Sequence, residues 1–182
     1  MAKLVLTEEE QMVRESAADF LAEQAGADAL REIRDTENPL GYSADTWQQM
    51  IELGWPAILV PEEQGGLGFS HAAMGQIMEL SGSCLACSPL FATAVAGTSV
   101  LSLGGSDAQK SELLPMVAAG ELTLALAVDE AGRHDPASVA MAATASEGGY
   151  TLNGNKCFVA DGSVADQLIV AARTSGAPGH TD

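Results

Sequence analysis

The sequence predicts an α+β fold in which an all-helical first part precedes an incomplete antiparallel β-sandwich or barrel. The main observation is a change of hydrophobic period near Leu122. Apolar residues recur every three or four positions before it and form short, strand-like runs after it. Capping motifs typical of helices occur before Leu122, whereas Gly-Gly and Asn-Gly pairs divide the part after it. We therefore expect a helical domain over residues 1–121 and the first part of a β domain over residues 122–182.

Serine and threonine residues mark where the helices of the first part should begin. Thr7 and Ser106 each open a capping box, because a Glu or Gln follows three residues later and the two residues satisfy each other's backbone N–H groups. Ser43 and Ser70 are also preferred N-cap residues. Residues 89–103 are apolar on nearly all sides, which predicts a central buried helix. The expected helices cover residues 7–26, 28–34, 43–54 and 89–103, with two more beginning at 70 and 106.

Glycine and proline mark the connections. Residues 53–68 contain two prolines and four glycines, which predicts an ordered connector instead of a helix. Asn153-Gly154 is the strongest hairpin signal, because a type I′ turn needs positive φ at both central residues. Residues 174–182 indicate a loop, and a sheet that stopped there would leave an unpaired edge, so we expect an incomplete β domain. The expected strands lie near residues 122–128, 138–146, 150–153, 156–160 and 167–173.

Charge and composition exclude several classes of function. The formal net charge is −17, from 25 acidic and 8 basic residues, and such a surface repels nucleic acids and anionic membranes. No run of 18 apolar residues occurs, so no membrane-spanning helix is expected. The three cysteines, an odd number, favour a reducing compartment over a disulfide framework. A cytoplasmic protein is the expectation.

The common chemical motifs are missing or incomplete. Cys84 and Cys87 have the C-x-x-C spacing, but no second pair supplies the four ligands of a zinc site, so no metal is expected. Cys157 has no His or Asn partner that the sequence identifies. The chain also lacks a G-x-G-x-x-G, a P-loop and a G-x-S-x-G motif. Composition and spacing alone therefore indicate only an acidic, helical-plus-β protein.

Three stretches together resemble one known family. They are Glu52-Leu-Gly-Trp55 with Pro61-Glu-Glu-Gln-Gly-Gly-Leu-Gly68, then Gly104 to Lys110 with Gly120-Glu121, and Tyr150-Thr-Leu-Asn-Gly-Asn-Lys156 with Asp161-Gly162. In this order they are similar to the acyl-CoA dehydrogenase family of flavoproteins, over essentially the whole chain. The resemblance implies a helical domain, a middle β domain and a C-terminal helical domain, the last of which is absent here.

The resemblance also implies an activity and its partners. Family members oxidise an acyl-CoA thioester between Cα and Cβ with FAD, pass electrons to an acceptor such as an electron-transfer flavoprotein, and assemble as homo- or hetero-oligomers. The catalytic base is a glutamate of the C-terminal domain, so no catalytic residue is expected in this chain. The cofactor-binding positions that the resemblance implies are Leu126, Val128, Asp129, His134, Asp135, Phe158, Val159 and Ala160, with Asp135 also facing substrate.

The chain departs from the family pattern at these positions. Asp129 and Asp135 stand where the family's Thr and Ser touch the flavin and its phosphates. Phe158-Val159-Ala160 replaces Trp-Ile-Thr, which removes an indole N–H and a hydroxyl. A carboxylate about 4 Å from an anionic group costs roughly 4 kcal/mol at an effective dielectric of 20.

Three functions therefore remain open at the level of sequence. The first is an FAD-dependent acyl-CoA dehydrogenase subunit, and the second is an oxygen-using flavoprotein oxidase or monooxygenase of the same fold. The third is a partner subunit that binds no flavin, has no catalytic role of its own and pairs with a flavin-competent homologue in a hetero-oligomer. The first is the leading prediction, and the aspartates at positions 129 and 135 motivate the third as its alternative.

Overall fold

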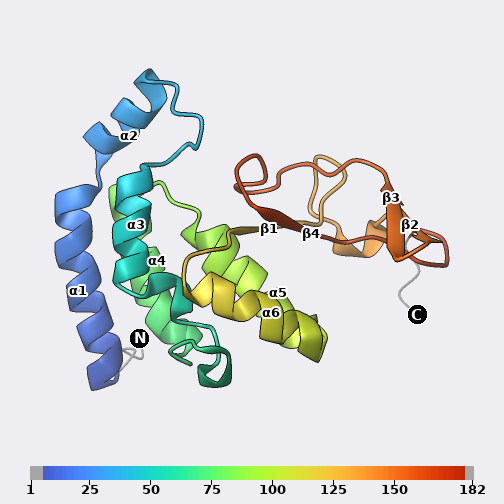
Figure 1. Ribbon diagram of the computed structural model, residues 1–182. Helices are drawn as coiled ribbons and strands as arrows, with labels where there is room; N and C mark the ends of the chain where they lie inside the picture. Colours follow the sequence, from blue (N-terminus) through green and yellow to red (C-terminus); the bar gives the residue numbers. More distant parts are fainter. Residues whose placement is uncertain (1–5, 179–182) are drawn as a thin grey trace, which may run out of the picture. The chain divides into compact units, whose positions relative to one another are not determined.

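The computed structural model describes residues 6–178. The chain forms two compact units, Met1–Thr123 and Leu124–Asp182, and each is described by itself. The α-helices of the described residues lie in the first unit and the strands in the second (Figure 1), which confirms the α+β fold class. The α-helices are α1 (Glu8–Gln24), α2 (Ala27–Asp35), α3 (Ala44–Glu52), α4 (His71–Cys84), α5 (Thr98–Gly104) and α6 (Asp107–Ala118).

Both predicted capping boxes are present. The Thr7 N–H donates to Glu10 Oε2 (3.0 Å) while the Glu10 N–H donates to Thr7 Oγ1 (3.1 Å). Ser106 and Gln109 make the same reciprocal pair at the start of α6. Ser43 and Ser70 accept backbone N–H groups at the starts of α3 and α4, as expected. These side chains therefore fix where four of the helices begin, because they satisfy donors that have no partner within the helix.

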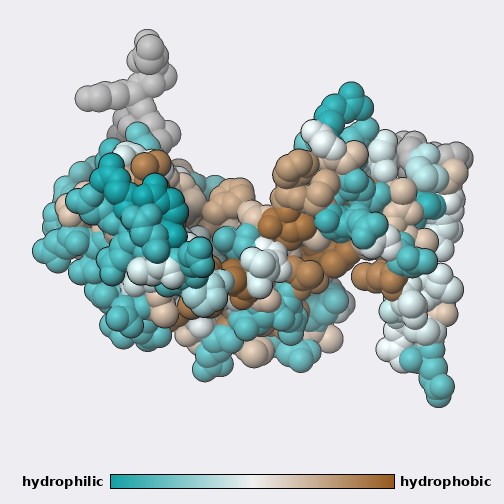
Figure 2. Space-filling model, turned by 90° about the horizontal axis from the view of Figure 1, so that it is seen from above, coloured by the Kyte–Doolittle hydropathy of each residue, from teal (hydrophilic) through white to brown (hydrophobic). Residues whose placement is uncertain are grey.

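The core of the first unit lies between α1, α3, α4 and α6. Its fully buried side chains include Met50, Ile77 and Leu114. Helix α1 packs along α4, where Arg14 Nη1 donates to Gln76 Oε1 (2.7 Å) and to Glu79 Oε2 (2.8 Å). Figure 2 shows hydrophilic residues over much of the visible face of the molecule, interrupted by smaller apolar patches.

The predicted connector over residues 53–68 is an ordered loop. It contains two 3₁₀ turns, η1 (Trp55–Ala57) and η2 (Glu62–Gln64). Leu67 and Gly68 donate backbone hydrogen bonds to the carbonyls of Ala57 and Val60, so the loop folds back on itself. A Cβ at Gly66 would lie only 2.0 Å from the Val60 carbonyl oxygen, which makes glycine obligatory there.

The expected helix over residues 89–103 is present, but its burial was predicted wrongly. It consists of a π-helical segment, η3 (Phe91–Gly97), followed by α5. Ala94 and Leu101 are buried, whereas Phe91 is 56% and Leu103 is 88% exposed. An apolar helix is buried all round only when neighbours cover every side, and residues 6–178 cover one side of this one.

The second unit holds two small sheets. Strand β1 (Leu124–Ala127) pairs with β4 (Gln167–Val170), and β2 (Ala142–Ser146) pairs with β3 (Gly149–Asn153). The β2–β3 pair is antiparallel as expected, but the β1–β4 pair is parallel. The long connection between β1 and β4, which includes the 3₁₀ turn η4 (Pro136–Ser138), allows the chain to cross over before it pairs.

Two local predictions in this unit were wrong. The hairpin turn is Glu147-Gly148, with Gly148 at φ 82°, and not Asn153-Gly154. Residues 156–160 form no strand, because Lys156 and Cys157 bond to the segment after β1 and Phe158 adopts a left-handed φ of 53°. No helix of the described chain is long and apolar enough to cross a membrane.

Replacing Gly66 by Ala should destabilise the first unit by about 2–4 kcal/mol, because the new Cβ collides with backbone that cannot move away. Urea unfolding followed by the fluorescence of Trp47 and Trp55 reports on this unit. Gly75→Ala in α4 is the control, since a Cβ there meets nothing within 4 Å. Equal urea midpoints for the two variants would contradict the account of the connector.

Candidate functional site

The candidate site is built from two segments of the second unit, residues 128–141 after β1 and residues 154–162 after β3. Lys156 Nζ donates to the Val128 carbonyl (2.9 Å), and the Cys157 N–H donates to the Asp129 carbonyl (2.8 Å). Cys157 Sγ also donates to the Ala131 carbonyl (3.3 Å). The structure therefore places the beginnings of the two segments side by side.

Glu130 is the centre of the polar contacts in this region. Its Oε1 accepts Lys156 Nζ at 2.6 Å and the Met141 N–H at 2.9 Å, while its Oε2 accepts the Ala140 N–H at 2.7 Å. The Lys156 side chain is 6% exposed and that of Glu130 is 18% exposed. The hydrogen bond from Lys156, then that from Met141, lowers the pKa of Glu130 to about 2, although burial opposes the shift.

The two aspartates of the loop are paired within the loop itself. Asp129 Oδ1 lies 2.9 Å from His134 Nδ1. Asp135 Oδ2 accepts Ser138 Oγ at 3.0 Å and Arg133 Nη2 at 3.3 Å. Both carboxylates thus bond to side chains two to five positions away in the same loop. The arrangement keeps negative charge at the positions where the family pattern has hydroxyls.

The remaining cofactor-binding candidates differ in their burial. Leu126 lies in β1 opposite Ile169, and it is half-buried like Val128. Phe158 is 78% exposed on its left-handed backbone. Val159 is half-buried and Ala160 is exposed. An aromatic side chain with this exposure forms no apolar wall among the described residues.

Three residues of this region were not predicted as site residues from the sequence. Glu130 and Lys156 form the central ion pair, and Lys156 is the only lysine of the second unit, which was the available signal. Asp161 has a left-handed φ of 56°, and burial raises the pKa of its carboxyl group. Such strained, half-buried positions are invisible to hydrophobic patterning.

FAD does not fit the side chains that this chain offers. Its pyrophosphate is anionic, while the loop presents the carboxylates of Asp129 and Asp135, whose neighbours Arg133 and His134 are already bonded to them. Ala160 has no hydroxyl to bond the flavin ring. Among the described residues there is no group of three or more His, Cys, Asp or Glu that could hold a metal ion.

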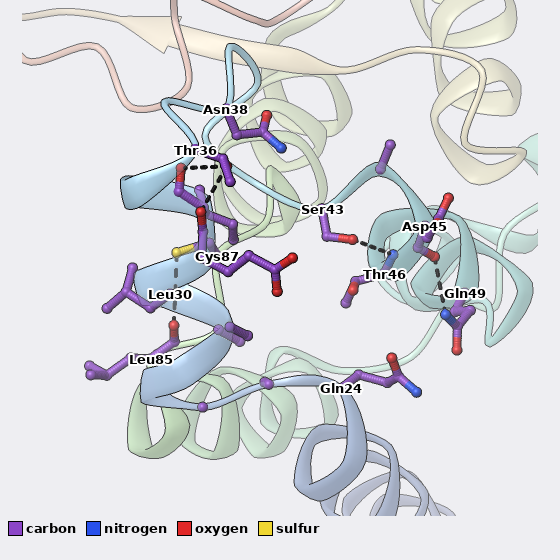
Figure 3. A pocket seen from close by; sticks show the side chains of 17 residues that line it. Gln24, Leu30, Thr36, Asn38, Ser43, Asp45, Thr46, Gln49, Leu85 and Cys87 are labelled. Atoms are coloured by element: carbon purple, nitrogen blue, oxygen red, sulfur yellow. Dashed lines mark hydrogen bonds between the residues drawn. The ribbon is translucent and has the colours of Figure 1, made fainter.

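A separate pocket of about 570 Å³ lies in the first unit. It is lined by α2, by the first turns of α3 and by residues 85–87 after α4 (Figure 3). Several of its polar groups are satisfied locally, since Ser43 Oγ accepts the Thr46 N–H and Cys87 Sγ donates to the Leu85 carbonyl. It shares no residue with the cofactor-binding positions that the family resemblance implies.

Lys156→Met should destabilise the second unit by about 3 kcal/mol, because it leaves the Glu130 carboxylate buried without its cation. Hydrogen exchange at the amides of Ala140 and Met141, which donate to that carboxylate, measures the loss locally. Lys110→Met in α6 removes the same charge from the first unit and should leave both amides unchanged. Unchanged exchange in Lys156→Met would contradict the role given to the pair.

Acid should weaken the same region. Because the pKa of folded Glu130 lies below its ordinary value of 4.5, its ionised form stabilises the fold above pH 4.5, and this stabilisation is lost as the pH falls towards about 2. Unfolding midpoints measured between pH 5 and pH 2 should therefore fall more steeply for the natural chain than for Glu130→Gln. Parallel curves would refute the assignment.

Comparisons with known proteins give a consistent result. The model of the family described as acyl-CoA dehydrogenase, N-terminal domain, matches residues 7–121. The 3-(aryl)acrylate reductase of Clostridium sporogenes is 33% identical over 97% of this chain and 46% of its own length. Isovaleryl-CoA dehydrogenase of Pongo abelii is 33% identical over 93% of this chain and 40% of its own length. The chain thus spans less than half the length of these relatives.

Solved structures agree with the sequence comparison. An acyl-CoA dehydrogenase from Geobacillus kaustophilus superposes with a TM-score of 0.77 at 29% identity, over 95% of this chain and 45% of that one. The Tcur3481-Tcur3483 steroid ACAD gives a TM-score of 0.81 at 27% identity, over 91% and 45%. The matched family model covers more than half of this chain. The chain therefore belongs to the acyl-CoA dehydrogenase family.

Proposed function

We propose that this chain is a subunit of an assembly that oxidises an acyl-CoA thioester between Cα and Cβ, and that it acts there as the partner of a flavin-binding homologue. Family membership supports the reaction class. The partner role rests on one observation: Asp129 and Asp135 in the loop after β1 are already bonded to His134 and Arg133 of the same loop. The homologue would then bind the cofactor and provide most of the surface that contacts the substrate and the electron acceptor.

The geometry of the loop is the argument for an unfilled flavin position in this chain. To receive a phosphate or a reduced flavin, the loop would have to separate Asp129 from His134 and Asp135 from Ser138, and would still present two carboxylates to an anion. The net charge of −17 offers little positive potential elsewhere to compensate.

The position of the aromatic residue supports the same role. Phe158 is largely exposed, so it is available for contact with another chain and supplies no enclosed surface for a flavin ring. Ala160 next to it provides no hydrogen bond, which a hydroxyl would contribute at about 1 kcal/mol. The alternative of a flavin-binding dehydrogenase or oxidase subunit requires that backbone N–H groups alone hold the cofactor.

The ratio of FAD to chain tests the proposal. The chain purified alone should carry far less than one FAD per copy, and co-expression with a flavin-competent homologue should give a hetero-oligomer with one FAD for each pair. Absorbance of the bound flavin and native mass spectrometry measure both quantities. One FAD per copy of this chain in a homo-oligomer that bleaches on addition of acyl-CoA would refute the partner role.

Restoring the family's residues should restore flavin binding. Asp129→Thr, Asp135→Ser and Ala160→Thr together remove two negative charges and add the missing hydroxyls, so FAD should bind measurably more tightly in a fluorescence-quenching titration. Asp19→Asn with Glu112→Gln removes the same charge from exposed positions in α1 and α6 and should have no effect. Equal FAD affinity in the two variants would show that these positions do not exclude the cofactor.

A further inference from the structure

Helix α2 is an amphipathic helix that the first unit does not bury. Leu30 and Ile33 lie on its apolar side, while Asp28, Arg31 and Glu32 are exposed. None of its residues is buried, in contrast to α1, α3 and α4. An apolar face of this kind normally packs against a core, because its burial stabilises the helix. In α2 this face is only partly buried.

The attachments of α2 are local. Arg31 pairs with Asp28 (2.6 Å) and Arg34 with Asp35 (2.7 Å), both within the helix. Its N-cap, Gly26, makes no side-chain cap hydrogen bond. Figure 1 shows α2 beyond the ends of α1 and α3, apart from the body of the unit. These contacts stabilise the helix itself without fixing its position.

Glycines in left-handed or otherwise unusual conformations stand on both sides of α2. Gly26 has φ 135° and Gly41 has φ 71°, and a Cβ at either position would meet nothing within 4 Å. Their conformations therefore depend on backbone freedom alone and not on lack of space. Hinges are a few such terminal residues that absorb a change of φ and ψ.

The pocket of about 570 Å³ lies between α2 and the rest of the unit. Figure 3 shows Leu30 on the α2 side and Ser43, Thr46 and Gln49 on the α3 side, with Cys87 next to α2. Movement of α2 towards α3 would narrow this space and remove Leu30 and Ile33 further from water. We propose that α2 is a hinged cover of this pocket, which moves about Gly26 and Gly41 between the open position seen here and a closed one.

Cys87 provides a natural reporter, because it lines the pocket while Cys84 and Cys157 do not. Maleimide labelling of the full chain, followed peptide by peptide, gives three rates in one experiment. Gly26→Ala and Gly41→Ala each disfavour the positive φ of the open position, by about fivefold in population. They should slow labelling of Cys87 severalfold and leave Cys84 and Cys157 unchanged.

Matched variants separate the hinge from other effects. Gly75→Ala in α4 adds the same methyl group at a helical φ and should leave all three rates as they are. Ile33→Ser weakens the closed position and should accelerate Cys87, whereas Arg31→Ser on the exposed side should not. Equal Cys87 rates in all variants would overturn the proposal, as would a joint rise of all three rates in the hinge variants, which reports unfolding.

Discussion

The ion pair between Glu130 and Lys156 is the constraint on which the second unit depends. Its strands are short, and a pair of two-stranded sheets has little capacity to hold long loops by itself. One carboxylate ties together the end of β1, the approach to β2 and the segment after β3. A buried pair of this kind contributes chiefly to specificity of arrangement, because desolvation offsets much of the attraction between its charges.

The contacts of Asp129 and Asp135 within their own loop limit what the loop can offer to a ligand. In a chain with few basic residues, Arg133 and His134 contact Asp135 and Asp129 within the loop. A ligand at this loop would meet backbone groups and a net negative electrostatic potential. The likeness of a fold to its family does not by itself assign a cofactor.

Much of the helical unit could be predicted from sequence, because its signals are local. The capping residues Thr7 and Ser106 specify helix starts with neighbours three positions away. The exposed side of the helix at Phe91 and Leu103 could not be predicted, since burial depends on what packs nearby. Asn153-Gly154 failed as a hairpin for a related reason: turn propensity is a local preference, which the contacts of Lys156 outweigh.

The pairing of side chains in the candidate site could not be predicted from the sequence. Resemblance to the family indicates the two segments, whereas the pairing of each aspartate with a particular neighbour depends on the path of the loop. The role of Glu130 needs three partners that are 10 to 26 positions away, as the separations in its hydrogen bonds show. No window of local pattern contains such information.

The parallel pairing of β1 with β4 also sets an order of assembly. Leu124 meets Gln167, so β1 has no partner strand until the chain has been synthesised or folded as far as β4. The β2–β3 hairpin lies between them in sequence and closes through a two-residue turn, which is the faster event. The candidate site lies between β1 and β4 in the sequence, so these two strands can pair only by closing a much longer loop than the turn of the β2–β3 hairpin.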